Sequence, residues 1–146
     1  MLNDTGGKID KIGGVISVDD MVLDKHYSNA DKSEIIAYYY SGKYHDMVKG
    51  INIITFYYTD PQAVRVPVNC RIIDPKEKKT KNELFREMLK KILDWGFKPN
   101  YVTGDSCYSS KENMKFITKY EIRFCLELSA IGLFHLKKAL GLKCKR

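Results

Sequence analysis

The order of hydrophobic and polar residues divides the first half of the chain into three predicted strands. Residues 15–23 have β-forming residues at both odd and even positions, which predicts a central strand with both faces covered. Residues 51–58 predict a second strand that ends in a turn at 59–61. Residues 64–72 alternate, with one face formed by Val64, Val66, Val68, Cys70 and Ile72, and the other by Arg65, Asn69 and Arg71. Because Pro67 lacks a donor for the strand ladder, this third strand is expected at the edge of an antiparallel meander.

A helix is predicted next, over residues 81–95. Thr80 and Glu83 have the spacing of a capping box, which marks the helix start. An apolar stripe at helical spacing follows, formed by Leu84, Phe85, Met88, Leu89, Ile92 and Leu93. Gly96 stands where the residue after a helix C-terminus adopts a left-handed conformation. These signals agree on both ends of the helix.

Two strands and a second helix complete the pattern. Residues 100–104 predict a strand parallel to its neighbour, Ser109 and Glu112 predict the capped start of a second helix, and residues 122–126 predict a last strand. The order β-β-β-α-β-α-β predicts an α/β fold with a mixed sheet, in which an antiparallel meander of three strands precedes parallel β-α units. This is the ribonuclease H-like arrangement, in which the first and fourth strands lie side by side.

Three acidic residues lie on those two strands. Asp19 and Asp20 interrupt the first strand, where carboxylates are costly to bury unless a metal, another cation or a water-filled cleft lies beside them. Asp105 follows Gly104 at the carboxyl end of the fourth strand, where open α/β sheets place their active sites. Two structural alternatives stay open: one of the paired acids contacts a nearby lysine such as Lys25, or Asp105 only caps the turn after it.

The segment between the first two strands, residues 24–50, mixes aromatic and basic residues. Lys43, His45 and Lys49 lie among several tyrosines, a combination that binds a phosphate backbone and stacks on bases. The same segment is equally consistent with a loop that packs its tyrosines on the sheet. His45 is expected to form structural hydrogen bonds rather than to act in catalysis.

Composition narrows the class of protein. The 146 residues suit one domain, and a net charge of +7 with a pI near 9.1 favours a polyanionic partner, nucleic acid first. Four cysteines without C-x-x-C spacing argue against a zinc site and are consistent with free thiols in a reducing compartment. The chain shows neither a signal peptide nor an apolar run of about 20 residues, so a cytoplasmic protein without membrane contact is expected.

Three motifs, taken in order, carry a resemblance to a known family: Ile16-Ser-Val-Asp-Asp-Met-Val-Leu-Asp-Lys25, His45-Asp-Met-Val-Lys-Gly50 and Val102-Thr-Gly-Asp-Ser-Cys-Tyr-Ser-Ser-Lys-Glu-Asn113. Across residues 14–125 the chain resembles the catalytic core of a bacterial insertion-sequence transposase of the DDE type. The third motif carries the family's second catalytic aspartate, which matches Asp105. The first catalytic aspartate matches Asp20, with Asp19 as the other choice.

The resemblance implies DNA transposition by metal-dependent phosphodiester cleavage and strand transfer. Asp20, Asp105 and Asp19 would hold Mg²⁺ or Mn²⁺, and such cations activate water or a DNA 3′-hydroxyl and stabilise the leaving oxygen. Lys43, His45 and Lys49 would contact DNA. The implied partner is double-stranded DNA, as transposon ends and as target, and a homodimer is compatible with this class.

The chain departs from the family in two respects. The third acidic residue of the family has no match, because Glu112, Glu121 and Glu127 belong to other elements or positions. A family-type DNA-recognition region before the first aspartate is also missing. The expected organisation is a polar segment (1–13), a partial catalytic domain (14–126) that is incomplete at its C-terminus, and a basic tail (127–146). The tail fits either an amphipathic helix or a peptide introduced by a frameshift after Phe124 or Cys125.

Three functions therefore stay open. The chain is a transposase core with little or no activity, a smaller metal-dependent nuclease of the same fold, or a non-catalytic module that binds DNA through Lys43, Lys49 and the lysines of residues 76–81. The first accounts for most of the sequence.

Overall fold

The structure is a computed structural model that describes residues 9–28, 33–41 and 44–126. Its strands are β1 (Val15–Asp24), β2 (Ala37–Ser41), β3 (Asp46–Thr59), β4 (Arg65–Ile72), β5 (Tyr101–Gly104) and β6 (Arg123–Leu126). Its α-helices are α1 (Lys81–Asp94) and α2 (Lys111–Lys119), and its short 3-10 helices are η2 (Pro75–Glu77) and η3 (Ser106–Tyr108). Lys43 and the tail at 127–146 lie outside the described residues.

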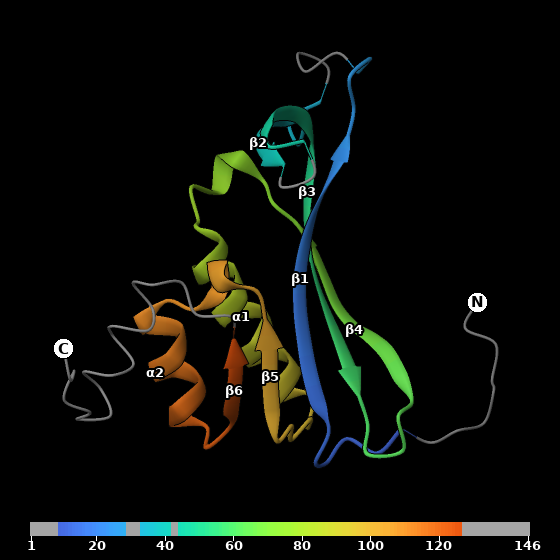
Figure 1. The fold of residues 1–146 in the computed structure, drawn as a ribbon, viewed down its shortest axis with the longest axis vertical. Coiled ribbons are helices and arrows are strands. Elements are labelled where there is room, and N and C mark those ends of the chain that lie inside the picture. The colour runs from blue at the N-terminus through green and yellow to red at the C-terminus, as the bar shows by residue number, and fades with distance from the viewer. Residues whose placement is uncertain (1–8, 29–32, 42–43, 127–146) are drawn as a thin grey trace, which may run out of the picture.

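The six strands form one mixed sheet, in the order β2-β3-β1-β5-β6, with β4 also paired to β3 (Figure 1). The meander β1-β3-β4 is antiparallel, whereas β5 pairs in parallel with both β1 and β6. The predicted α/β class, the meander and the parallel β-α units are therefore confirmed, and the topology is consistent with a ribonuclease H-like fold. The predicted neighbours, the first strand and the strand before Asp105, do lie side by side.

The two α-helices cover the same face of this sheet. Even-numbered strand residues such as Ile16, Val18 and Phe56 form one hydrophobic core with Phe85 of α1 and Ile117 of α2. The capping box predicted for α1 is present, since Thr80 and Glu83 each accept a hydrogen bond from the other's backbone N–H. Gly96 has the predicted left-handed backbone, with φ 86°. Burial of this apolar surface is the main force that holds α1 and α2 on the sheet.

The start of β1 fits tightly against β3 through a glycine. A Cβ atom on Gly14 would lie 2.3 Å from the carbonyl oxygen of Thr59 and 2.5 Å from the hydroxyl of Tyr58. The Gly14 N–H donates to that hydroxyl at 3.1 Å, and the hydroxyl donates to the carbonyl of Asp10 at 2.8 Å. Only glycine allows this close approach, which anchors the strand that carries Asp20.

The structure corrects the prediction that both faces of β1 are covered. The outer face, opposite the helices, exposes Met21 (52%) and Leu23 (37%), and by register Met21 pairs with Ile53, which pairs with Ile72. The end of β1 extends beyond the two helices, with β2 and the first part of β3 beside it (Figure 1). The apolar residues at odd positions thus signal an uncovered apolar face rather than a buried one.

The alternation predicted for the third strand is wrong beyond Pro67. Phe56 pairs with Asn69 and Tyr57 pairs with Pro67, so Val68 is an extra residue in a β-bulge. The bulge reverses the two faces: after it, Asn69 is half-buried while Cys70 is exposed. The edge position inferred from Pro67 is confirmed, because β4 pairs only with β3 among the described residues.

Two further local predictions are corrected. The polar and aromatic segment before residue 51 contains β2 and the first five residues of β3, which form an antiparallel pair. The second helix begins one residue later than predicted, because Ser110, not Ser109, accepts the N–H of Asn113 as the N-cap. Ser109 instead ends η3, and its hydroxyl donates to the carbonyl of Ser106 at 2.7 Å.

We expect the double substitution Met21→Thr and Ile72→Thr to change the free energy of unfolding by less than about 1 kcal/mol, because both residues are about half exposed on the outer face. It should also reduce aggregation, since it removes apolar surface from the outer face. Urea denaturation and light scattering measure the two effects. Ile54→Thr, on the buried face, is the control and should cost about 2 kcal/mol or more. A large loss in the double variant would mean that the outer face is covered in solution.

Candidate functional site

The candidate site lies where β1 and β5 end beside the start of α1. Val18 pairs with Gly104 in the parallel register, so Asp20 is two residues and Asp105 one residue past the last pair. Parallel neighbours end at the same edge of a sheet, and a helix that runs back toward β5 begins at that edge. The topology therefore gathers residues from three distant segments at one place.

Asp20 is the acid of the site with the most side-chain partners. Its side chain is only 13% exposed, and Lys81, the first residue of α1, places Nζ 2.5 Å from Oδ2. The hydroxyl of Tyr108 donates to Oδ1 at 3.0 Å, and the thiol of Cys107 approaches the same oxygen at 3.7 Å. Thus three side chains fix the orientation of one carboxylate. The suggested partner Lys25 is not involved, because a lysine 61 positions away in sequence fills that role.

Asp105 is more exposed and caps η3. Its Oδ1 accepts the backbone N–H of Cys107 at 2.5 Å, which is the capping role anticipated as an alternative. Cys107 therefore meets both acids, because its backbone N–H donates to Asp105 and its thiol approaches Asp20. Capping and a role in the site are compatible, because Oδ2 of a capping aspartate remains available.

Asp19 lies on the other face of the sheet from Asp20. Successive residues of a strand point to opposite faces, and Asp19 is exposed on the side away from α1 and α2. Its Oδ1 accepts the backbone N–H of Asp20 at 2.8 Å. The structure therefore brings Asp20 and Asp105 together but leaves Asp19 apart from them.

The acids perturb their neighbours strongly. Burial first, and then the negative charge of Asp20, raises the pKa of the Tyr108 hydroxyl, whose residue is fully buried. Burial of the sulfur first, and then the carboxylates of Asp105 and Asp20, raise the pKa of the Cys107 thiol, although the residue as a whole is exposed. Both groups therefore stay protonated at neutral pH, where they act as hydrogen-bond donors to the carboxylates.

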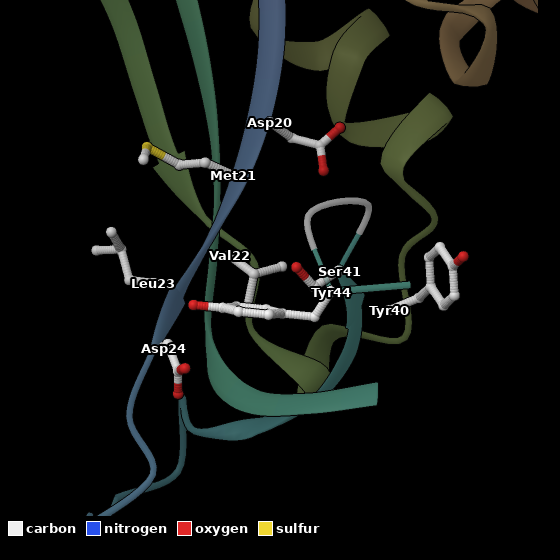
Figure 2. Close-up of a pocket in the computed structure, with 8 residues that line it drawn as sticks. All are labelled: Asp20, Met21, Val22, Leu23, Asp24, Tyr40, Ser41 and Tyr44. Atoms are coloured by element: carbon white, nitrogen blue, oxygen red, sulfur yellow. The ribbon is translucent and has the colours of Figure 1, made fainter. Parts of the chain in front are cut away.

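A cavity of about 480 Å³ begins at Asp20 and follows the end of β1 (Figure 2). It is lined by Asp20, Met21, Val22, Leu23, Asp24, Tyr40, Ser41 and Tyr44. Asp20 and Asp24 lie at opposite ends, with Val22, Ser41 and Tyr44 between them. His26 lies 3.1 Å from Oδ2 of Asp24. The cavity gives the Asp20 carboxylate a solvent-accessible approach along β1, although Asp105 does not line it.

Two of the three predicted DNA-binding residues, His45 and Lys49, belong to the β2–β3 hairpin. His45 is exposed in the turn between β2 and β3, with φ 52°. Lys49 belongs to the outer face of β3, opposite Tyr38 in the β2 register. Lys43 is not described. A DNA contact through His45 and Lys49 would therefore lie on the β2–β3 hairpin.

Asp20 and Asp105 together supply the number of carboxylates that a typical magnesium site takes from the protein. Mg²⁺ is commonly held by one or two carboxylates together with water and substrate phosphates, and Asp20 and Asp105 supply one each. Within residues 9–28, 33–41 and 44–126, no three His, Cys, Asp or Glu side chains are grouped closely enough to hold a metal ion. A cation held by Asp20 and Asp105 would therefore need its remaining ligands from water or from a bound phosphate.

The sequence comparisons identify no family for this chain: no protein-family model and no curated protein matches it. Among solved structures, it is similar to a chain of the cryo-EM structure of the simian T-cell lymphotropic virus intasome in complex with PP2A regulatory subunit B56 gamma. The sequence identity is 10%, the TM-score is 0.43, and the match covers 92% of this chain but 40% of that chain. In the described part of the chain, neither α-helix is long and apolar enough to cross a membrane.

Sequence reasoning missed three members of the site. Cys107 and Tyr108 lie inside the motif that carries Asp105, but the 3-10 turn η3 is what directs them toward Asp20. In the sequence, Lys81 is one of several lysines in the basic connector at 76–81. A signal for it was present, because a helix that precedes a parallel strand starts at the edge where that strand ends, and the capping box of Thr80 fixes that start.

Proposed function

We propose that the chain contains a DDE-type transposase core of the bacterial insertion-sequence class, with weak residual activity on double-stranded DNA. The observation that carries this proposal is the parallel pairing of β1 with β5, which places Asp20 and Asp105 at one edge of the sheet. Cys107 meets both acids there, because its thiol approaches Oδ1 of Asp20 at 3.7 Å and its backbone N–H donates to Oδ1 of Asp105. The resemblance of the three sequence motifs to that family supports the same assignment. The net charge of +7 favours a polyanionic substrate.

In this proposal Asp20 and Asp105 hold Mg²⁺ or Mn²⁺, which when bound supplies positive charge for the reacting phosphodiester and an activated water or 3′-hydroxyl. Tyr108 orients the Asp20 carboxylate through its hydrogen bond to Oδ1. The start of α1 adds the partial positive charge of a helix N-terminus beside Asp20. Residual rather than full activity is expected because no third carboxylate joins these two within the described residues.

The direct test uses supercoiled plasmid and the purified full chain. We expect slow conversion to the nicked form with about 5 to 10 mM Mn²⁺, and none with EDTA. The Mn²⁺ concentration is high because only two carboxylates hold the cation. A short duplex of radiolabelled DNA then shows whether cleavage leaves a 3′-hydroxyl. The absence of any cation-dependent product would contradict the proposed chemistry.

A second function, binding of nucleic acid without cleavage, is favoured by the tyrosines of β2. Tyr38 and Tyr40 are 65% and 60% exposed, and their register partners on β3 are Lys49 and Met47. Exposed aromatic rings beside a positive charge stack on unpaired bases and contact phosphates. This surface lies on the β2–β3 hairpin, and its Tyr40 also lines the cavity that begins at Asp20.

For this function we expect single-stranded DNA affinity to fall steeply with salt, because binding releases counterions from the phosphates. The double variant Tyr38→Ala, Tyr40→Ala should weaken binding by about 10-fold or more, at roughly 1–3 kcal/mol for each stacked base. Fluorescence anisotropy at several salt concentrations measures both effects. Tyr27→Ala, another exposed tyrosine, is the control. Equal affinities of all variants would exclude the hairpin as the binding surface.

A further inference from the structure

We propose that Lys81 is a built-in counter-ion that competes with a divalent cation for Asp20, so that the cation binds tightly only when DNA phosphates add their oxygens. This inference rests on the proposed function, since it assumes that Asp20 and Asp105 are the cation ligands. The proposed function assigns no role to Lys81 and no dependence of cation binding on DNA, and this inference adds both.

The two oxygens of Asp20 have different partners. Oδ1 accepts the hydroxyl of Tyr108 and faces the thiol of Cys107, whereas Oδ2 is paired with Nζ of Lys81 at 2.5 Å. The oxygen left for a cation is therefore Oδ2, and the ammonium group of Lys81 already occupies it.

The Lys81–Asp20 pair is less exposed than an ordinary surface pair, and the start of α1 fixes the position of its lysine. Lys81 is the first residue of α1, whose start is fixed by the reciprocal hydrogen bonds of Thr80 and Glu83. The Asp20 side chain is 13% exposed, so solvent screens its charge less than it screens exposed pairs. The Lys81 side chain is 37% exposed, which leaves its flexible stem a route into solvent when a cation displaces it.

The consequence is that the Asp20 carboxylate keeps a neutralising partner when no metal is bound. A cation that binds to Oδ2 has to displace the ammonium group, which lowers its apparent affinity. Asp105 supplies the second carboxylate, and Mg²⁺ commonly completes its coordination with substrate phosphates. Bound DNA would supply those oxygens at the moment when the cation is needed.

The test measures Mn²⁺ binding to the full chain without DNA, by electron paramagnetic resonance and by isothermal titration calorimetry. We expect Lys81→Met to tighten the Mn²⁺ dissociation constant about 10-fold, and Lys81→Arg, which keeps a cation beside Asp20, to bind as the unaltered chain does. Asp20→Asn should abolish binding in either background. If Lys81→Met binds Mn²⁺ no more tightly than the unaltered chain, the proposal is wrong.

Lys79→Met is the matched control. It removes the same charge two residues earlier, from a pair with Glu87 at 2.7 Å, and leaves Asp20 untouched. An equal gain in Lys79→Met and Lys81→Met would show a general charge effect and would overturn the proposal. If Lys81→Met does not fold, as shown by circular dichroism, Lys81→Gln keeps a hydrogen-bond donor to Asp20 without the charge, and the same expectation applies.

The outcomes separate this inference from the proposed function. Tighter Mn²⁺ binding in Lys81→Met, together with no DNA cleavage by any variant, would support the counter-ion and refute the nuclease chemistry. Cleavage that depends on Asp105, together with Mn²⁺ affinity that is insensitive to residue 81, would support the nuclease chemistry and refute the counter-ion.

Discussion

Replacement of Asp105 by Asn is expected to reduce Mn²⁺-dependent nicking to the level of the EDTA control. The substitution keeps the size of the side chain and its oxygen, so the cap on the N–H of Cys107 can still form. It removes the negative charge that a hard divalent cation requires. Loss of an outer partner of a metal ligand already costs about 10- to 100-fold, so loss of a ligand should cost at least about 100-fold. Asp20→Asn should have the same effect.

Asp19→Asn is the control that separates a loss of charge in the site from a loss of charge elsewhere on β1. It removes the same charge one residue from Asp20, but on the opposite face of the sheet. We expect it to nick DNA within about 2-fold of the unaltered chain, since it leaves the contacts of Asp20 and Asp105 in place. A contaminating nuclease would survive in all three variants. Nicking by Asp105→Asn at the unaltered rate would show that Asp105 serves only as the cap of η3.

The position of the two acids was predictable because it depends on element order. Once the chain is divided into a meander and β-α units, the pairing of β1 with β5 follows from the fold class, and the structure confirms it. Whether Asp19 or Asp20 faces the site was harder to predict from the sequence. Ile16 and Val18 share the parity of Asp20 and are buried, but the equally apolar odd positions of β1 hid which face carries the helices.

Other features could not be read from the sequence because they depend on contacts between distant segments. Lys81 and Asp20 are 61 positions apart, and a run of lysines carries no sign of which one meets a carboxylate. The bulge at Val68 exists only relative to β3, so the simple alternation of the strand pointed Cys70 and Ile72 to the wrong face. Likewise β2 is defined by its pairing with β3, not by a strong pattern of its own.

The aromatic residues between helix and sheet connect stability to the geometry of the site. Phe85 of α1 is fully buried and lies between two rings, with centroid distances of 5.6 Å to Phe56 and 5.5 Å to Tyr108. Tyr108 in turn donates its hydroxyl to Asp20 at 3.0 Å. A change at Phe85 therefore reaches the carboxylate through a single intervening side chain, without touching any charged group.

We expect Phe85→Ala to lower the free energy of unfolding by about 3–5 kcal/mol, because it removes buried apolar surface and leaves a cavity between α1 and β3. Such a loss is a large part of the roughly 5–15 kcal/mol that stabilises a domain. Urea denaturation followed by circular dichroism measures it. Phe116→Ala is the control, since Phe116 is only partly buried and packs on Tyr120 near the surface, so it should cost less. A cost below about 1 kcal/mol for Phe85→Ala, with an unchanged denaturant slope, would mean that α1 does not pack on the sheet as described.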